Sequence, residues 1–263
     1  MTHYDVVYGI TVHEQPLSVE DLTKNIQYYN HTLKICIILN ASSDIYDAVK
    51  HLETTHVRVI FSPRPRRMVT YDILEGYLEV FEYCTANSIS ADYFIPIASN
   101  CMFWKEVTKD TLLGTLGKST LQSTSIPIKH TGWWWPKIYA NKNIVSILGS
   151  QGIHNLKSSQ HEGVVIEFSI MEKISTFIKE HRIKENVEYQ TVFEEFLLST
   201  LYTHYTGRDL GSLCRIFWEL REYSPSKEHI LACSLPCVKR VSREYNSPVR
   251  VWLRERAENY IRE

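Results

Sequence analysis

Residues 33–39 read LKICIIL, a run in which six of seven residues are apolar. A run of this kind is typical of a strand that is covered on both faces of a parallel sheet. The segments on either side fit such a sheet, because strands are predicted at residues 5–12 and 57–61 and helices at residues 18–29 and 43–53. Strand and helix therefore alternate from the start of the chain.

Two further elements extend this alternation. Ser18, with Asp21 three residues later, predicts a capping box at the start of the first helix. Apolar side chains recur every three to four positions over residues 71–85, which predicts a longer helix, and a strand is predicted at residues 93–98. The pattern indicates an α/β fold: a mainly parallel sheet with right-handed crossovers and helices on both faces.

Ligands of such sheets bind beyond the carboxyl ends of the strands. The loops that follow the predicted strands should therefore line the site. The residues that we predict at this edge are His13, Asn40, Arg64, Arg67, Ser99 and Asn100. The arginine loop 62–67 (SPRPRR) either meets phosphate or is a solvated loop stiffened by its prolines.

Beyond residue 100 the pattern is mixed. Helices are predicted at residues 169–179, 191–205 and 213–221, and a charged helical segment runs to the end without a stop signal, as in a fragment of a longer chain. We expect one domain over residues 1–263.

Charge and hydropathy exclude several classes of function. Lys and Arg number 29 against 30 Asp and Glu, so the net charge of -1 provides no overall field for nucleic acid or an anionic membrane. No segment approaches the roughly 18 apolar residues of a membrane span, and no secretory leader is evident, so we expect a soluble cytoplasmic chain. The pair Cys233 and Cys237 is too little for a four-ligand zinc site.

Common catalytic motifs are absent from the sequence. It contains no GxGxxG, GxxxxGK[ST], HExxH or GxSxG. It also contains no DxD, the pair of carboxylates that commonly holds a divalent metal against a nucleotide diphosphate. A site for such a nucleotide would then need Lys or Arg in place of a metal, and no metal cofactor is expected.

Four stretches resemble one enzyme family. RRMVTYDILEGYLEVFEYC and DYFIPIASNCMFW, then SSQHEGVVIEFSIMEKISTFI and FEEFLLSTL, follow the order of motifs in the core-2/I-branching β-1,6-N-acetylglucosaminyltransferases. The resemblance is patchy over residues 5–245 and is closest in FEEFLLSTL. It implies a GT-A fold and transfer of a sugar from a UDP-sugar to a glycan hydroxyl. Residues 1–100 would then be the nucleotide-sugar-binding half, and residues 101–263 the acceptor-binding and catalytic half. The residues predicted at the sheet edge would lie on the donor side: His13, Asn40, Arg64, Arg67, Ser99 and Asn100.

The resemblance also implies roles for particular residues. Glu195 occupies the position of the family's catalytic base, and Glu194 replaces the preceding Asp; an inverting transfer needs one carboxylate to take the acceptor proton. The alternative is that both glutamates lie on a solvated helix face. Glu162 and His161 would bind the acceptor, with Glu162 as a second candidate base or a helix cap.

Two clusters complete the predicted site. Lys239 and Arg240 would neutralise the departing diphosphate, unless they form an exposed basic turn. Trp133 and Trp134 stand in a triple tryptophan whose side chains diverge, so at least one should be exposed and able to stack on a sugar ring, an interface or a membrane.

The sequence therefore favours an inverting, metal-independent glycosyltransferase that uses a UDP-sugar and a glycan acceptor. The alternatives are a metal-dependent or retaining transferase, with distant carboxylates such as Asp92, and a non-catalytic carbohydrate-binding protein. Binding of nucleic acid through the arginine loop is disfavoured by the neutral net charge.

Overall fold

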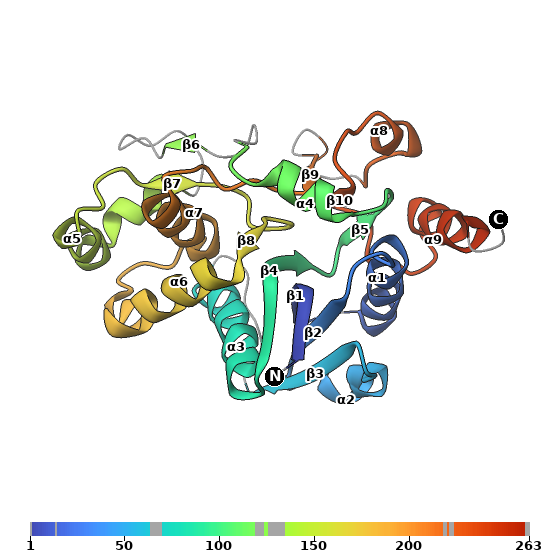
Figure 1. The fold of residues 1–263 in the computed structure, drawn as a ribbon, viewed down its shortest axis with the longest axis horizontal. Helices are drawn as coiled ribbons and strands as arrows, with labels where there is room; N and C mark the ends of the chain where they lie inside the picture. The colour runs from blue at the N-terminus through green and yellow to red at the C-terminus, as the bar shows by residue number, and fades with distance from the viewer. Residues whose placement is uncertain are drawn as a thin grey trace.

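The computed structural model describes residues 2–13, 15–63, 70–118, 124–125, 135–217, 220 and 224–260. Its centre is a five-stranded sheet with strand order β3-β2-β1-β4-β8 (Figure 1). The four strands from β3 to β4 run parallel, and β8 is antiparallel to β4. The predicted α/β class and the mainly parallel sheet are confirmed.

The first hundred residues build most of this sheet. Their elements are β1 (Thr2–Val12), α1 (Pro16–Tyr29), β2 (Ile35–Ser42), α2 (Tyr46–Val49), the 3₁₀ turn η1 (Lys50–Leu52), β3 (Val57–Ser62), α3 (Asp72–Ala86) and β4 (Ile89–Ala98). All four predicted strands are present. The helix predicted over residues 43–53 is one helical turn followed by a 3₁₀ turn.

The rest of the described chain covers the sheet and adds two small sheets, β5-β10-β9 and β6-β7. Its elements are β5 (Cys101–Phe103), α4 (Lys109–Thr115), β6 (Thr124–Ser125), η2 (Trp135–Ala140), α5 (Lys142–Ser150), β7 (Lys157–Ser158), β8 (Ile166–Glu167), α6 (Phe168–Glu180), η3 (Ile183–Asn186), α7 (Phe193–Thr206), β9 (Cys214–Ile216), α8 (Lys227–Leu231), β10 (Cys237–Lys239) and α9 (Pro248–Tyr260).

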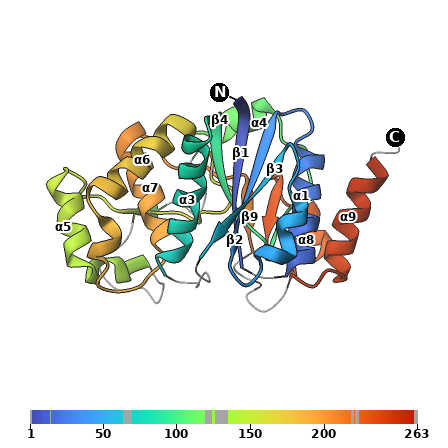
Figure 2. The same ribbon diagram turned by 90° about the horizontal axis from the view of Figure 1, so that it is seen from below.

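Both faces of the central sheet are covered, which explains the apolar strands. Val6 and Val7 are both fully buried and belong to different core clusters, because successive strand side chains point to opposite faces. Helices α3, α6 and α7 lie on one side, and α1 and α9 lie on the other (Figure 2). Within the described residues, every helix is too short or too polar to cross a bilayer.

Two local predictions were wrong. The helix predicted over residues 213–221 is in part the strand β9, which pairs with β10. The capping box is also absent: α1 begins two residues earlier, at Pro16, where the fixed backbone angle of proline suits the first helical position. Ser18 is buried inside the helix and donates to the Arg243 carbonyl, and Asp21 pairs with Arg250 at 3.0 Å.

Candidate active site

A backbone hydrogen bond holds the loop between β7 and β8 against the carboxyl end of β4. The Gly163 N–H donates to the Pro96 carbonyl at 2.7 Å, and the Ser212 hydroxyl donates to the Glu162 carbonyl at 2.8 Å. Gly163 has a φ of +72°, and a Cβ there would lie 2.6 Å from Cβ of Cys214. Glycine is therefore required in this turn, which holds Gln160, His161 and Glu162 at the edge of the sheet.

A buried ion pair forms the centre of the site. The Lys239 ammonium donates to Oε1 of Glu162, and Nε2 of His161 lies 3.1 Å from the same oxygen. Glu162 comes from the loop before β8, and Lys239 comes from the end of β10. The ring of Tyr77, on α3, lies 5.5 Å from the His161 ring and closes one side of this group.

The protonation states follow from burial and charge. Burial lowers the pKa of His161 to about 4, so its ring is neutral at neutral pH. Burial alone would raise the pKa of Glu162, but His161 and Lys239 hold that pKa below its usual value. A neutral imidazole whose Nε2–H faces Glu162 leaves Nδ1 as an acceptor. Burial opposes the charge of Lys239, but Glu162 keeps the lysine pKa above its usual value.

Glu194 and Glu195 enter this site from the first turn of α7. The Ser159 N–H donates to the Glu195 carbonyl at 2.9 Å, which fixes the helix start against the loop that leads to His161. Glu194 and Glu195 are only 4% and 7% exposed, so the solvated helix face is not observed. Burial and the neighbouring charge of Glu195 raise the pKa of Glu194 well above its usual value.

These environments distinguish the carboxyl group of Glu194 from that of Glu162. The raised pKa of Glu194 favours its protonated form, which can donate a hydrogen bond. Glu162 is committed to its ion pair with Lys239, which lowers its basicity. The role of Glu195 as the catalytic base stays a prediction.

Several buried polar atoms at this site lack a hydrogen-bond partner within the described structure. They are Nδ1 of His161, Oε2 of Glu162, Oε2 of Glu194 and both amide atoms of Gln160. An unpartnered buried polar atom costs roughly 1–3 kcal/mol, so native proteins keep few of them. Their concentration here makes this site a candidate for binding a polar ligand.

Two of the residues predicted to bind the donor, Asn40 and Arg240, form hydrogen bonds within the protein. The Asn40 amide donates to the Gly76 carbonyl at 3.0 Å and to Glu79 at 2.7 Å, so its N–H groups tie β2 to α3. The Arg240 backbone has a φ of +73°, and its guanidinium donates to the Phe217 carbonyl at 3.0 Å. None of these hydrogen bonds is to Glu162 or to Lys239.

The end of β4 keeps its predicted place at the site edge. Ser99 is buried, and the Arg243 guanidinium lies 3.5 Å from its hydroxyl. The Asn100 carbonyl accepts from the Val241 N–H at 3.1 Å, which ties this edge to the segment that follows Lys239. His13 is partly buried directly after β1. Arg64, Arg67, Trp133 and Trp134 lie outside the described residues, so their predicted roles stay predictions.

Sequence reasoning gave no site role of their own to three residues in or beside this group. Tyr77 was predicted only as part of an apolar helix stripe, and Gln160 precedes His161 in the quoted motif without a role of its own. Glu194 was predicted as a replacement for an aspartate. Two adjacent acids at a helix start were a usable signal, because the helix dipole favours acids there.

A separate cavity of about 810 Å³ lies between α4, β9 and α8. Its lining includes Arg215, Phe217 and His229. Ser212 also lines it and donates to the Glu162 carbonyl, so the cavity adjoins the backbone of the buried group.

Comparison with known proteins gives a likeness of shape only. No protein family model and no curated protein matches the sequence. The solved structures that are similar include an active-site mutant of LgtC, with a TM-score of 0.47, and the galactosyltransferase LgtC in complex with donor and acceptor sugar analogues, with a TM-score of 0.46. Each has 11% identity over 97% of this chain and 95% of the other. Such values assign neither a family nor an activity, and the resemblance to the branching transferases stays a prediction.

Proposed function

We propose that this chain is a glycosyltransferase that moves a sugar from a UDP-sugar to a glycan hydroxyl, with inversion and without a catalytic metal. The observation that carries the proposal is the buried group of Glu162, Glu194, Glu195, His161 and Lys239 beside the carboxyl end of the parallel sheet. Sheets of this class bind ligands there. The motif FEEFLLSTL adds support, since it contains Glu195 at the position of a transferase base.

The proposed reaction needs one base, and the acceptor oxygen must attack the anomeric carbon from the side opposite the diphosphate. Glu195 takes the proton of the acceptor hydroxyl as that oxygen bonds to the anomeric carbon of the donor. The bond from the anomeric carbon to the diphosphate oxygen breaks, and its electron pair leaves with UDP. A single displacement of this kind inverts the anomeric configuration. His161 and Glu194 offer an acceptor and a donor of hydrogen bonds to the sugar hydroxyls.

The leaving diphosphate needs positive charge. We assign this role to Lys239 and Arg243, because Lys239 is held in the buried group and Arg243 lies beside Ser99 at the end of β4. Fixed cations aimed at a developing charge lower the barrier without reorganisation during the reaction. Arg240 was predicted for this role together with Lys239, but its described contact is with the Phe217 carbonyl.

The experiment is calorimetric titration of UDP and several UDP-sugars into the protein with EDTA, followed by donor hydrolysis and transfer assays in the same buffer. We expect metal-free binding and slow hydrolysis. Glu195→Gln should keep nucleotide binding and lose about 10²–10⁴-fold in turnover, the usual contribution of a general base.

Glu172→Gln is the matched control, because Glu172 is exposed on α6 and its replacement should change neither binding nor turnover. Binding that requires manganese would instead support a metal-dependent transferase. Glycan binding without turnover in the unmodified chain would support a carbohydrate-binding protein. Absence of nucleotide binding would refute the proposal.

A further inference from the structure

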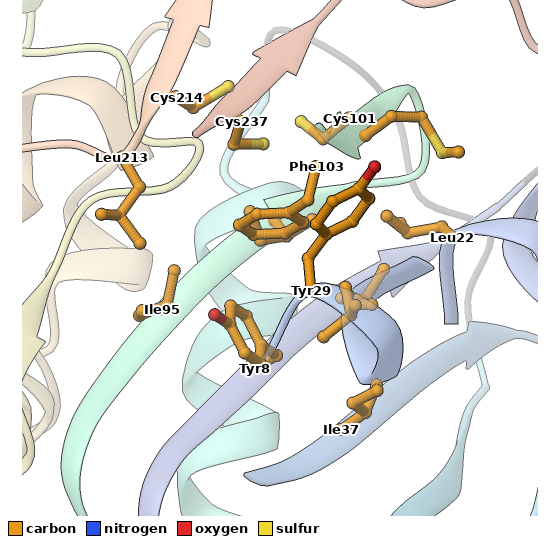
Figure 3. Close-up of a cluster of buried hydrophobic side chains, with 14 of the residues drawn as sticks. Tyr8, Leu22, Tyr29, Ile37, Ile95, Cys101, Phe103, Leu213, Cys214 and Cys237 are labelled. Atoms are coloured by element: carbon orange, nitrogen blue, oxygen red, sulfur yellow. The ribbon is translucent and has the colours of Figure 1, made fainter. Parts of the chain in front are cut away.

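Three cysteines from distant parts of the sequence lie close together in the small sheet that also carries Lys239. Cys101, Cys214 and Cys237 lie on β5, β9 and β10, the three strands of the second sheet. Cys237 pairs with Cys214 in register, and Cys101 pairs with Lys239, two residues further along β10. Since residues two apart on a strand share a face, the three thiols lie on one face of the sheet. Figure 3 shows their sulfur atoms turned toward one another.

The geometry suits a metal ion. The three Sγ atoms all lie within 4.8 Å of one another, and none forms a disulfide. Thiolates bound to zinc at about 2.3 Å in a tetrahedral site are roughly 3.8 Å apart. A contraction of about 1 Å or less would therefore bring the thiols to metal-binding distance.

Buried cysteines also occur as small apolar side chains, and this chain contains an internal comparison. Cys36 and Cys84 are buried as deeply as the three, with exposures of 1% and 0%. They do not belong to a set of three ligating side chains, whereas Cys101, Cys214 and Cys237 form the one such set among the described residues. Convergence of three thiols, not burial, distinguishes the cluster.

We propose that Cys101, Cys214 and Cys237 bind one thiophilic metal ion, Zn²⁺ or Cu⁺, through three sulfur ligands. Each thiol that becomes a ligand releases its proton on binding, and no change of oxidation state is needed. Soft thiolate donors select these two ions among the common metals. Among the described residues, no fourth His, Cys, Asp or Glu belongs to the set. Cu⁺ would therefore be three-coordinate, and Zn²⁺ would need a fourth ligand that is not one of these side chains, such as water.

The position of the cluster indicates a structural role. Cys237 precedes Lys239 by two residues, Cys101 directly follows Asn100, and Cys214 packs against Gly163, the residue after Glu162. A metal ion here would join β5, β9 and β10 and hold the Lys239–Glu162 pair in place. This inference does not depend on the proposed function, because metal binding is measured without any sugar or nucleotide.

The test is metal loading of the full chain. The protein is unfolded and refolded anaerobically with a thiol-free reductant and either Zn²⁺ or Cu⁺, desalted, and analysed for bound metal by mass spectrometry. We expect about one ion per chain with at least one of the two metals. Cys237→Ala should lose the ion, while Cys84→Ala, an equal truncation of a buried cysteine outside the cluster, should keep it.

A second measurement covers the case in which Cys237→Ala does not fold. Cd²⁺ added to the unmodified refolded chain should give a sulfur-to-metal charge-transfer absorption that saturates at one equivalent and protects three thiols from alkylation. Retention of no metal by the unmodified chain, or stoichiometric binding that survives Cys237→Ala, would refute the site. A difference between the Zn²⁺ and Cu⁺ experiments identifies the ion.

Discussion

At the scale of single residues, burial changes the acid–base behaviour of His161. Its side chain is buried against Tyr77 and Glu162, and burial lowers its pKa to about 4 from the usual 6.5. In the unfolded chain the same ring takes up a proton as the pH falls through about 6.5. The folded protein resists this proton, so acid favours the unfolded state.

We therefore expect the free energy of unfolding to fall as the pH is lowered from about 6.5 to about 4. The contribution of His161 to that loss is about 3 kcal/mol over the whole interval, from the difference between its folded and unfolded pKa values. His161→Gln should remove this part of the slope. Urea unfolding at several pH values measures it, with the surface variant His154→Gln as the control. An unchanged slope in His161→Gln would contradict the protonation state described for the site.

At the scale of elements, a buried ion pair joins the last helix to the first. Arg250 on α9 is fully buried and donates to Asp21 on α1 at 3.0 Å, and Arg254 lies 3.7 Å from the other oxygen of Asp21. Burial raises the pKa of Asp21, and Arg250 offsets part of that effect. Removal of the arginine would leave an acid without its main partner in the core.

Arg250→Ala should therefore destabilise the protein by about 3 kcal/mol, the usual cost of removing one partner of a buried pair. Replacement of both partners, in Asp21→Asn with Arg250→Met, should recover part of this loss because no buried charge remains. Equilibrium urea unfolding gives both values. Arg256→Ala, on the exposed side of α9, is the comparison and should change stability by less than about 0.5 kcal/mol. Equal losses in the single and the double variant would contradict the ion-pair explanation.

At the scale of the whole molecule, the proposed donor and acceptor together would contact segments far apart in the sequence. Ser99 follows β4, Glu162 precedes β8, and Lys239 ends β10. A ligand that binds these segments only in the folded chain stabilises all of them together.

UDP at a hundred times its dissociation constant should raise the free energy of unfolding by about 2.7 kcal/mol. For a chain of this size that corresponds to a rise in Tm of roughly 5–10 °C. Thermal unfolding with UDP and EDTA measures the shift, and uridine without phosphate is the control for the diphosphate contacts. A Tm that does not respond to saturating UDP would count against a nucleotide site at this edge.

The sequence by itself determined the fold of the first hundred residues. Strands β1 to β4 are visible in the sequence because a strand covered on both faces needs an uninterrupted apolar pattern, which is a local property. The helices α3, α6 and α7 are predictable for the same reason, since one apolar stripe records which side faces the core. The motif FEEFLLSTL also placed Glu195 on a helix, where the structure has it.

The tertiary structure alone decided which residues meet. The segment around Cys214 has a helical pattern but forms a strand, because pairing with β10 outweighs local propensity. Glu162 and Lys239 are 77 residues apart in sequence, and the three clustered cysteines come from three separate strands. The opposite pKa shifts of Glu162 and Glu194 depend on burial and on neighbouring charges, and these come from contacts between distant segments that no local pattern records.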